Sequence, residues 1–521
     1  MRERYDVAVV GSGFAGSLTA MIARQLGLRV ILLERGRHPR MMVGESSTPL
    51  SNLLLEELAT RYDLPVLRPL SKWGSWQETH PELACGLKRG FSFFHHAPDN
   101  GRTIERDRQL LVAASPNDGI GDTHWYRADF DAFLVDEARR IGVEYLDEVQ
   151  LRELADDGLV AVMRGVRGDC DVHIEARFVV DATGPRGFLH RALGLKERLL
   201  PGLPATRGLY GYFRSVRRLD EMGAVAMDAA PPYSVDDAAV HHLLDGGWVW
   251  VLRFNNGVTS AGIAATEGLA GILRLDEGAS AWKRVLGMVP VLHEQFRDAE
   301  AVQLFRSLPG LSFRSESICG HRWTMLPSAA GFVDPLLSTG FPLTLLGVSR
   351  LAEILERDWG KDAFATSLAE YAAKTEAELL ATARLIGALY VNLGNFPVFS
   401  AITLLYFTAA SYAETVRRLG RPHLAKSYLL YDHPEFGEAC TRVLERAHSV
   451  RPGEESDRLI EEIFRVIEPV DVAGLGRRER RNWYPVDADD LLNAAHKVHA
   501  SREEIAWMLG RCGFNAATLP V

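Results

Sequence analysis

Cysteine, long apolar runs and excess positive charge are all scarce in this 521-residue sequence. The five cysteines show no CxxC spacing, which argues against a disulfide framework or a zinc site and fits a reducing cytoplasm. A net charge of -9 at pH 7 gives no basis for nucleic-acid binding. Because the N-terminus also lacks the apolar core of a signal peptide, we predict a cytoplasmic protein.

An uninterrupted membrane-spanning run is missing as well. The longest apolar stretch, residues 385–412, is broken by Asn392, Asn395 and Pro397. A buried helical hairpin is therefore expected there rather than a membrane span, and we predict no contact with a membrane.

Metal-ligand spacing is also absent. Paired histidines occur at residues 95–96 and 241–242, but neither pair has a carboxylate or a cysteine at ligand spacing. We therefore predict no metal site.

A dinucleotide-binding signature opens the chain. A β-branched run at residues 5–10 leads into GSGFAG at residues 11–16, an amphipathic helix to about Leu26, and a second strand at residues 29–33 that ends at Glu34. The glycines permit a tight turn and close approach of a pyrophosphate to the helix N-terminus, and Glu34 can accept the ribose hydroxyls. The cofactor contacts predicted here are Gly11, Gly13, Ala15, Gly16, Glu34 and the adjacent Arg35.

Three later segments indicate which dinucleotide is bound. GESSTP at residues 44–49, WYRADFD at residues 125–131 and FVVDATG at residues 178–184 resemble the glutathione-reductase-type FAD fold. The resemblance implies that the FAD site includes Glu45, Ser46, Ser47, Arg127 and Asp181. Two alternatives stay open: a helix-start pairing of Arg127 with Asp129 or Asp131, and a loop-capping role for Glu45.

A lone cation interrupts the apolar, glycine-spaced stretch at residues 84–94. Lys88 is either a surface residue at the lip of a strand or a buried amine with a chemical role. Burial among Leu87, Phe91 and Phe93 would favour its neutral form.

The middle of the chain, residues 201–314, is rich in strand patterns. Trp248 and Trp250 lie two residues apart, so both point to one face of a strand, either as core packing or as the wall of a cavity. A Ser-Thr-Gly step at residues 338–340 precedes a long helix that we expect to begin near Thr344, and the amides of such a helix start favour an anion.

Four segments taken together, GSGFAG, KRGFSF, GWVWVLRF and AAGFVDPLLSTGF, resemble the flavin-dependent halogenases, in particular the branch acting on phloroglucinol-type phenols. The resemblance implies an α/β protein with a glutathione-reductase-type FAD-binding core at residues 1–350. That core includes a β-rich substrate subdomain at about 195–320, and residues 351–521 form a helical region that caps the substrate site. The implied roles are catalysis for Lys88, a tunnel wall for Trp248 and Trp250, halide binding for Ser338, Thr339 and Gly340, and flavin contacts for Asp334, Gly340 and Phe341.

Two departures from the family pattern bear on the substrate. The tryptophan signature ends in Leu252-Arg253 instead of Ile-Pro, which predicts a cation near the cavity wall. Leu337 stands where the tryptophan-halogenase branch has a glutamate that assists deprotonation of the substrate. A phenol is already activated and tolerates the loss of that base, so a small phenolic substrate is predicted.

The resemblance implies a reaction that consumes FADH2, O2 and chloride or bromide, and that delivers hypohalous acid through the tunnel to Lys88. The lysine would either hydrogen-bond the acid or form a haloamine. Because no second GxGxxG unit is present, we expect a separate NAD(P)H-dependent flavin reductase as partner of a monomer or homodimer. The alternatives are an aromatic-hydroxylating flavin monooxygenase, a flavin-dependent prenyl reductase and a non-catalytic FAD-binding protein.

Overall fold

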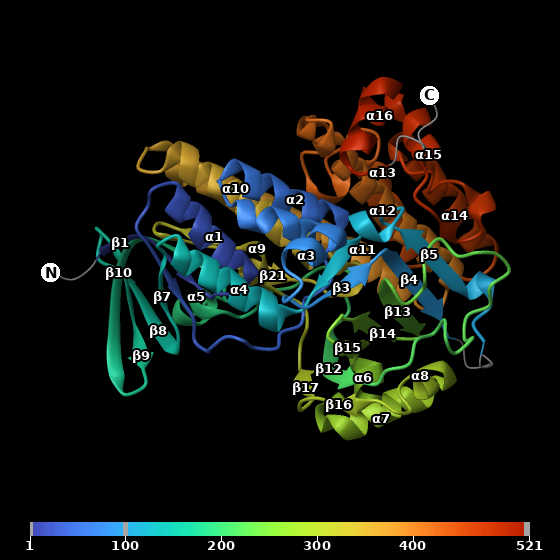
Figure 1. The fold of residues 1–521 in the computed structure, drawn as a ribbon, viewed down its shortest axis with the longest axis horizontal. Helices are drawn as coiled ribbons and strands as arrows, with labels where there is room; N and C mark the ends of the chain where they lie inside the picture. The colour runs from blue at the N-terminus through green and yellow to red at the C-terminus, as the bar shows by residue number, and fades with distance from the viewer. Residues whose placement is uncertain (1–3, 97–102, 515–521) are drawn as a thin grey trace.

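The computed structural model describes residues 4–96 and 103–514, so the expectation for the extreme N-terminus, residues 1–3, lies outside the described part. The molecule is elongated, with the N-terminal strands at one end and the C-terminal helices at the other (Figure 1). It contains the expected α/β architecture with an FAD-type core and a mainly helical C-terminal region.

The first sheet has eight strands around a parallel centre, six of them in the order β19-β20-β10-β1-β2-β7, with β9 also paired to β10 and β8 paired to β9. Strand β1 lies between β2 and β10 and is parallel to both, and α1 packs against α4. This arrangement confirms the predicted succession of strand, glycine turn, helix, strand and acid. The bounds are β1 Arg4–Val10, α1 Phe14–Gln25, β2 Val30–Leu33, α4 Arg127–Arg140, β7 Glu144–Leu146, β8 Val149–Asp156, β9 Ala161–Arg167, β10 Cys170–Asp181, β19 Cys319–Gly320 and β20 Trp323–Met325.

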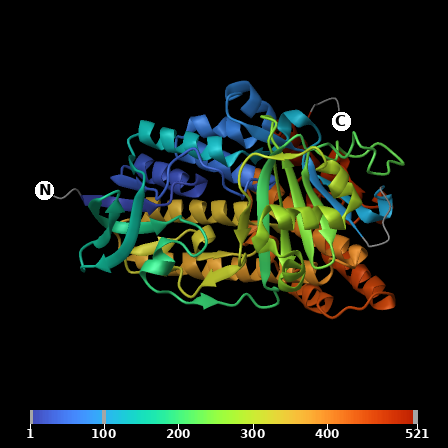
Figure 2. The same ribbon diagram turned by 90° about the horizontal axis from the view of Figure 1, so that it is seen from below.

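The second sheet has nine strands in the order β16-β12-β15-β14-β13-β4-β5-β22, with β17 beside β12. Figure 2 shows its green strands at the end of the molecule opposite the N-terminus. One face packs on α6, α7 and α8, and the other faces the main core. The bounds are β4 Gly90–His95, β5 Gln109–Ala113, β12 Thr206–Arg214, β13 Ala239–Leu244, β14 Gly247–Arg253, β15 Thr259–Thr266, α6 Glu267–Leu273, α7 Ala279–Met288, α8 Pro290–Gln295, β16 Glu300–Ala301, β17 Arg306–Leu308 and β22 Trp483–Tyr484.

This sheet draws its strands from three separate parts of the chain. The β-rich segment at 195–320 does not build the sheet alone, because β4 and β5 come from earlier in the chain and β22 from the C-terminal region. The predicted boundary at residue 350 falls inside α10, Gly340–Asp358. That helix also begins at Gly340 rather than near Thr344.

Two small sheets connect the large ones. Strand β3, Cys85–Lys88, pairs antiparallel with β6, Asp122–Trp125, and the chain turns at Arg89 from this pair into β4 of the nine-stranded sheet. The other small sheet contains β11 Glu197–Arg198, β18 Phe313–Ser315 and β21 Gly331–Phe332.

Helices cover the sheets and form the C-terminal region. The hairpin expected within residues 385–412 is present as α11 and α12, which are joined by a short turn at residues 392–395. By length and composition α12 could cross a membrane, but 83% of its apolar window is buried inside the protein, as in a core helix. The remaining bounds are α2 Pro49–Arg61, α3 Trp73–Thr79, α5 Phe188–Ala192, α9 Pro327–Ala330, α11 Ala363–Val391, α12 Phe396–Arg418, α13 Gly437–Ala447, α14 Glu454–Ile467, α15 Ala488–Asn493 and α16 Arg502–Arg511.

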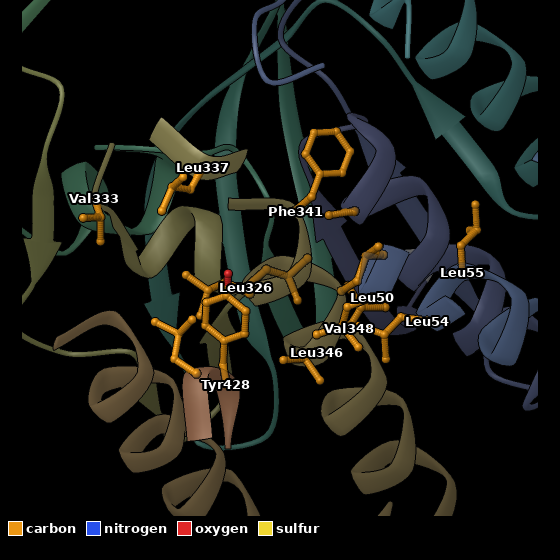
Figure 3. Close-up of a cluster of buried hydrophobic side chains, with 14 of the residues drawn as sticks. Leu50, Leu54, Leu55, Leu326, Val333, Leu337, Phe341, Leu346, Val348 and Tyr428 are labelled. Carbon is orange, nitrogen blue, oxygen red and sulfur yellow. The ribbon is translucent and has the colours of Figure 1, made fainter. Parts of the chain in front are cut away.

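A shared hydrophobic core fixes α10 against the rest of the protein. Figure 3 shows Leu50 and Leu54 of α2 beside Leu346 and Val348 of α10. Leu337, which precedes α10, is fully buried in the same core. The turn before α10 is therefore anchored from both sides by apolar side chains.

Candidate functional site

The glycine turn between β1 and α1 lies directly against the turn after β10. Gly11 has φ +100°, and a Cβ placed on it would stand 2.6 Å from the carbonyl oxygen of Ala182. A Cβ on Gly16 would stand 1.9 Å from the Gly11 carbonyl oxygen. Glycine is required at both positions, and the close approach leaves the first amides of α1 at the carboxyl edge of the sheet, with Ala15 buried behind them.

Glu34 ends β2 and turns back toward this loop. Its Oε2 accepts hydrogen bonds from the Ser12 backbone amide at 3.1 Å and from Arg40 at 2.9 Å. Burial alone would raise the pKa of Glu34, but Arg40 and the amides of Gly36 and Ser12 outweigh it and hold that pKa below its usual value. Arg35, predicted beside the acid, is exposed, and Arg40 takes the position next to the carboxylate.

Unpartnered polar atoms surround Ser12 and Glu34. Within the described residues, His38 Nδ1, Arg40 Nε and the Tyr145 hydroxyl are buried without a hydrogen-bond partner. Buried polar groups normally have partners. A carboxylate acceptor, a glycine cradle and unpaired donors together fit the adenosine half of FAD.

Arg127 pairs with Asp131, one of the alternatives left open for it. Its guanidinium pairs with Asp131 through bonds of 2.8 and 2.7 Å and donates to the Gly44 carbonyl at 2.9 Å. A Cβ on Gly13 would lie 3.2 Å from the same guanidinium, so Arg127 also borders the glycine loop.

Asp181 uses its carboxylate locally. It accepts from the Thr183 amide at 2.8 Å and from the Leu189 amide at 2.6 Å. These bonds shape the turn that faces Gly11, so Asp181 supports the nucleotide loop through backbone geometry.

Lys88 is fully buried at the end of β3. Its Nζ donates to Ser46 Oγ at 2.8 Å and to the Ser47 carbonyl at 2.5 Å, and it lies 3.7 Å from the centre of the Phe91 ring. Burial lowers the pKa of Lys88, and the negative charge of Asp122 opposes that shift. Ser46 and Ser47, predicted as cofactor contacts, hold the lysine.

Aromatic side chains pack against one another next to Lys88. Phe91 and Phe93 on β4 contact Phe407 and Phe399 of α12, with ring centres 4.9 and 5.8 Å apart. His241 on β13 lies 4.5 Å from Phe93. The phenylalanines and His241, together with Trp248, form what we call the aromatic chamber.

Trp248 and Trp250 share the face of β14 that borders this chamber, with ring centres 5.7 Å apart. Trp248 Nε1 donates to the Tyr390 hydroxyl at 3.1 Å, and that hydroxyl donates to Asp334 at 2.9 Å. Asp334 therefore contacts the tryptophan wall through Tyr390. Burial raises the pKa of Asp334 to about 7, against the stabilising bonds from the Leu336 amide and Tyr390.

Trp250 is linked in the same way to Glu45. Its Nε1 lies 3.4 Å from Ser260 Oγ, which donates to Glu45 Oε2 at 2.8 Å. Burial raises the pKa of Glu45 to about 7, and Glu45 Oε1 has no partner within the described residues. Glu45 is thus connected through Ser260 to the face of β14 that carries the two tryptophans.

The predicted halide turn has an unusual backbone. Leu337 and Ser338 both have positive φ, 62° and 56°, a conformation that non-glycine residues adopt at a cost and that is frequent at functional sites. Thr339 is buried, and Gly340 begins the 19-residue helix α10, whose first amides favour an anion. Phe341 stacks on Phe14 of the glycine loop at 4.9 Å, which joins the turn to the nucleotide site.

The predicted cation near the cavity wall is wrong. Arg253 lies on the opposite face of β14 from Trp248 and Trp250, because side chains alternate along a strand. Its guanidinium donates to Asp236 at 2.9 Å and to the Val216 carbonyl at 2.8 Å. It therefore supports a loop and leaves the chamber uncharged on that side.

Sequence reasoning missed three polar groups of the site. Asp122, Asn52 and Ser260 are buried, and none belongs to a recognised motif. The sole available signal was the alternation of Asp122 and His124 with Thr123 and Trp125, which places two polar side chains on one face of a buried strand. The paired histidines form no group of three or more metal-ligating residues in the described part of the chain.

Known proteins are similar to this chain in both sequence and fold. A family model described as FAD dependent oxidoreductase matches residues 6–301. The chain is 28% identical over 387 residues to monodechloroaminopyrrolnitrin halogenase PrnC of Pseudomonas fluorescens, an alignment covering 73% of this chain and 66% of that protein, just under two thirds. It is 27% identical to tetracycline 7-halogenase of Kitasatospora aureofaciens, covering 78% of this chain and 73% of that protein.

The fold is also that of solved halogenases. The crystal structure of halogenase PltM in complex with phloroglucinol and FAD superposes with a TM-score of 0.79 at 22% identity, covering 92% of this chain and 99% of that one. The chain therefore belongs to the FAD dependent oxidoreductase family. Within that family, the relatives that it resembles in sequence are halogenases.

Proposed function

We propose that this enzyme halogenates a small, electron-rich phenol with FADH2, O2 and chloride or bromide, and that Lys88 is its catalytic residue. The observation that carries the proposal is the position of Lys88, a buried amine beside the aromatic chamber that donates a hydrogen bond to Ser46 in the loop that also carries Glu45. A structural lysine would be expected to reach solvent with its amine.

Each part of the site has a separate task. Gly11, Gly13, Glu34 and Arg127 would hold FAD, and the reduced flavin with O2 supplies the oxidising equivalent that converts halide to hypohalous acid. The amides at Thr339 and Gly340 would hold the halide. The tryptophan wall would keep the organic substrate away from the flavin, while hypohalous acid, being small, passes to Lys88.

A phenol fits the chamber better than an aromatic hydrocarbon that lacks a hydroxyl group. Thr403 lies one helical turn from both Phe399 and Phe407, so it shares the face of α12 that lines the chamber. It is fully buried, and its hydroxyl has no hydrogen-bond partner within the described residues. A ring hydroxyl of the substrate would form the hydrogen bond that the Thr403 hydroxyl lacks.

The partner and the location follow from the same chemistry. We propose that a separate NAD(P)H-dependent flavin reductase supplies FADH2 and that the enzyme works in the cytoplasm. Five free cysteines, with Cys85 buried beside the site, are in keeping with a reducing compartment.

The test is the variant Lys88→Met, assayed with reduced FAD, oxygen, bromide and a phenol panel. Halogenated product is expected to fall about a hundredfold or more, in line with removal of a catalytic group. FAD binding should not change, since Lys88 lies outside the glycine turn. The exposed Lys283→Met is the matched control and should behave like the wild type.

Product masses separate the competing functions. A hydroxylated ring would identify a monooxygenase, a saturated isoprenoid a prenyl reductase, and FAD binding without turnover a non-catalytic protein. Unreduced bromination by Lys88→Met would exclude the lysine from catalysis.

A further inference from the structure

Strand register places a carboxylate opposite the catalytic lysine. In the antiparallel pair of β3 and β6, Lys88 is the direct partner of Asp122. Side chains directly opposite in such a pair have Cβ atoms about 4.5–5.5 Å apart. Lys88 is fully buried and Asp122 is 6% exposed, so two groups of opposite charge share a desolvated position.

The surroundings of Lys88 Nζ consist of acceptors. Ser46 Oγ and the Ser47 carbonyl receive two of its hydrogens, and the amine lies above the face of the Phe91 ring. An aromatic face attracts a cation or an N–H and repels a lone pair. The geometry therefore suits an ammonium with three directed hydrogens, whereas a neutral amine would direct its lone pair at the ring.

The surroundings of Asp122 suit a negative charge opposite the Lys88 ammonium. Asn52 donates to Asp122 Oδ1 at 2.7 Å, and Oδ2 is buried without a hydrogen-bond partner within the described residues. A buried carboxylate is stable only beside a compensating charge or donor. Burial raises the pKa of Asp122, and Lys88 is the largest influence in the opposite direction.

We propose that Asp122 is a positioning residue that keeps Lys88 in the ammonium form, so that Lys88 acts on hypohalous acid as a hydrogen-bond donor rather than as a nucleophile. The inference rests on the proposed function and chooses between the two lysine roles that the sequence leaves open. A carboxylate opposite an ammonium stabilises the charged form, whereas burial alone would leave the amine neutral.

With Lys88 as an ammonium, the atoms and protons of the halogen-transfer step balance. The carbon–halogen bond forms at the ring as the halogen–oxygen bond breaks, and the departing hydroxide takes a proton from the Lys88 ammonium and leaves as water. The halogenated ring then loses its proton, which returns to Lys88. Hypohalous acid and the arene thereby give the aryl halide and water, with Asp122 unchanged.

The histidines and the tyrosine near the pair are uncharged around neutral pH. Burial and the Lys88 charge lower the pKa of His124 and of His241 to about 3, so both are neutral. Burial raises the pKa of Tyr406, which also stays neutral. Glu414 and Arg418, which influence Asp122 from α12, form an ion pair with each other at 2.7 Å. Glu45 and Asp334, whose pKa burial raises to about 7, are present in both proteins, so a difference between the pH profiles of the wild type and Asp122→Asn is assigned to Lys88.

The experiment compares the pH dependence of bromination for the wild type and Asp122→Asn. Loss of the carboxylate lowers the pKa of Lys88, so the ammonium is lost at lower pH and the alkaline limb of kcat/KM moves down by about one pH unit or more. About a tenfold loss is expected at pH 8, with little change at pH 6. Thermal unfolding and FAD affinity establish that the variant is folded.

Two further variants complete the test. Asn52→Leu removes the hydrogen-bond donor to Asp122 and should move the alkaline limb of kcat/KM to lower pH by a smaller amount. This variant replaces Asp122→Asn in the test if Asp122→Asn does not fold. Asp118→Asn, which alters an exposed carboxylate paired with Arg89, should leave the profile unchanged.

The outcomes are distinct. An unmoved alkaline limb, or greater activity of Asp122→Asn at pH 7 to 8 as expected for a nucleophilic amine, would overturn the role of Asp122 alone. Failure of the wild type to form any brominated product would instead overturn the proposed function, and this inference with it.

Discussion

Three side chains in and around the site have a polar atom that is buried without a hydrogen-bond partner among the described residues. The hydroxyl of Thr403, the free oxygen of Glu45 and the free oxygen of Asp122 are all buried and unpartnered within residues 4–96 and 103–514. Leaving such groups unpaired costs about 1–3 kcal/mol each. A protein retains them where a ligand or a reaction uses them.

Thr403 gives the residue-scale prediction. Thr403→Val keeps the shape of the side chain and removes its hydroxyl, so kcat/KM for a phenol should fall about tenfold, mainly through KM, as expected for one hydrogen bond. Steady-state kinetics with a phenol measures this effect. Thr408→Val, which removes another unpartnered buried hydroxyl on a different face of α12, is the control. Equal effects of the two variants would contradict contact between Thr403 and the substrate.

At the scale of elements, hydrogen bonds join β14, α11 and the turn before α10. Tyr390 of α11 accepts from Trp248 and donates to Asp334, which in turn accepts from the Leu336 amide at 2.9 Å. The tryptophan wall and the halide turn are thus held in fixed relation by a helix from the C-terminal region.

Tyr390→Phe tests that connection. The variant leaves Trp248 Nε1 and one Asp334 oxygen buried and unpaired, so the free energy of unfolding in urea should fall by about 2 kcal/mol. The KM for bromide should rise, because the turn loses its support. Tyr412→Phe, which removes a 3.3 Å bond to a backbone carbonyl, should cost much less. A stable variant with an unchanged bromide KM would show that the halide turn does not depend on Tyr390.

On the scale of the whole molecule, the cofactor would join parts of the chain that are far apart in sequence. The loops after β1 and β10, Arg127 and the start of α10 meet at one edge of the first sheet. A ligand that binds only the folded state stabilises all of them together.

FAD should therefore raise the melting temperature of the wild-type protein, with about 2.7 kcal/mol of stabilisation at a concentration one hundred times Kd. Glu34→Gln removes the charge that is positioned for the ribose hydroxyls and should weaken FAD binding about tenfold, as one charge-assisted hydrogen bond does. Isothermal titration and thermal unfolding measure both effects. Glu148→Gln, an exposed carboxylate paired with Arg37, is the control. Equal FAD affinity of Glu34→Gln and the wild type would place the adenosine elsewhere.

Local sequence was sufficient for the features that depend on contiguous residues. The glycine turn and Glu34 follow from strand and helix periodicity together with the φ that only glycine adopts easily, and the hairpin of α11 and α12 follows from its apolar pattern. Strand alternation also decides that Arg253 faces away from Trp248, so the wrong expectation for Arg253 could have been avoided from the sequence.

Only the tertiary structure decided how the polar groups of the site are paired. Lys88 meets Ser46, Ser47 and Asp122 through strand pairings and loops that separate them by tens of residues, and Tyr390 reaches Asp334 from the C-terminal region. The sequence by itself determined the cofactor fold, because backbone conformation and periodicity are local properties. Register between distant strands and burial of single charges depend on long-range packing, and that packing determines which partners Lys88 has.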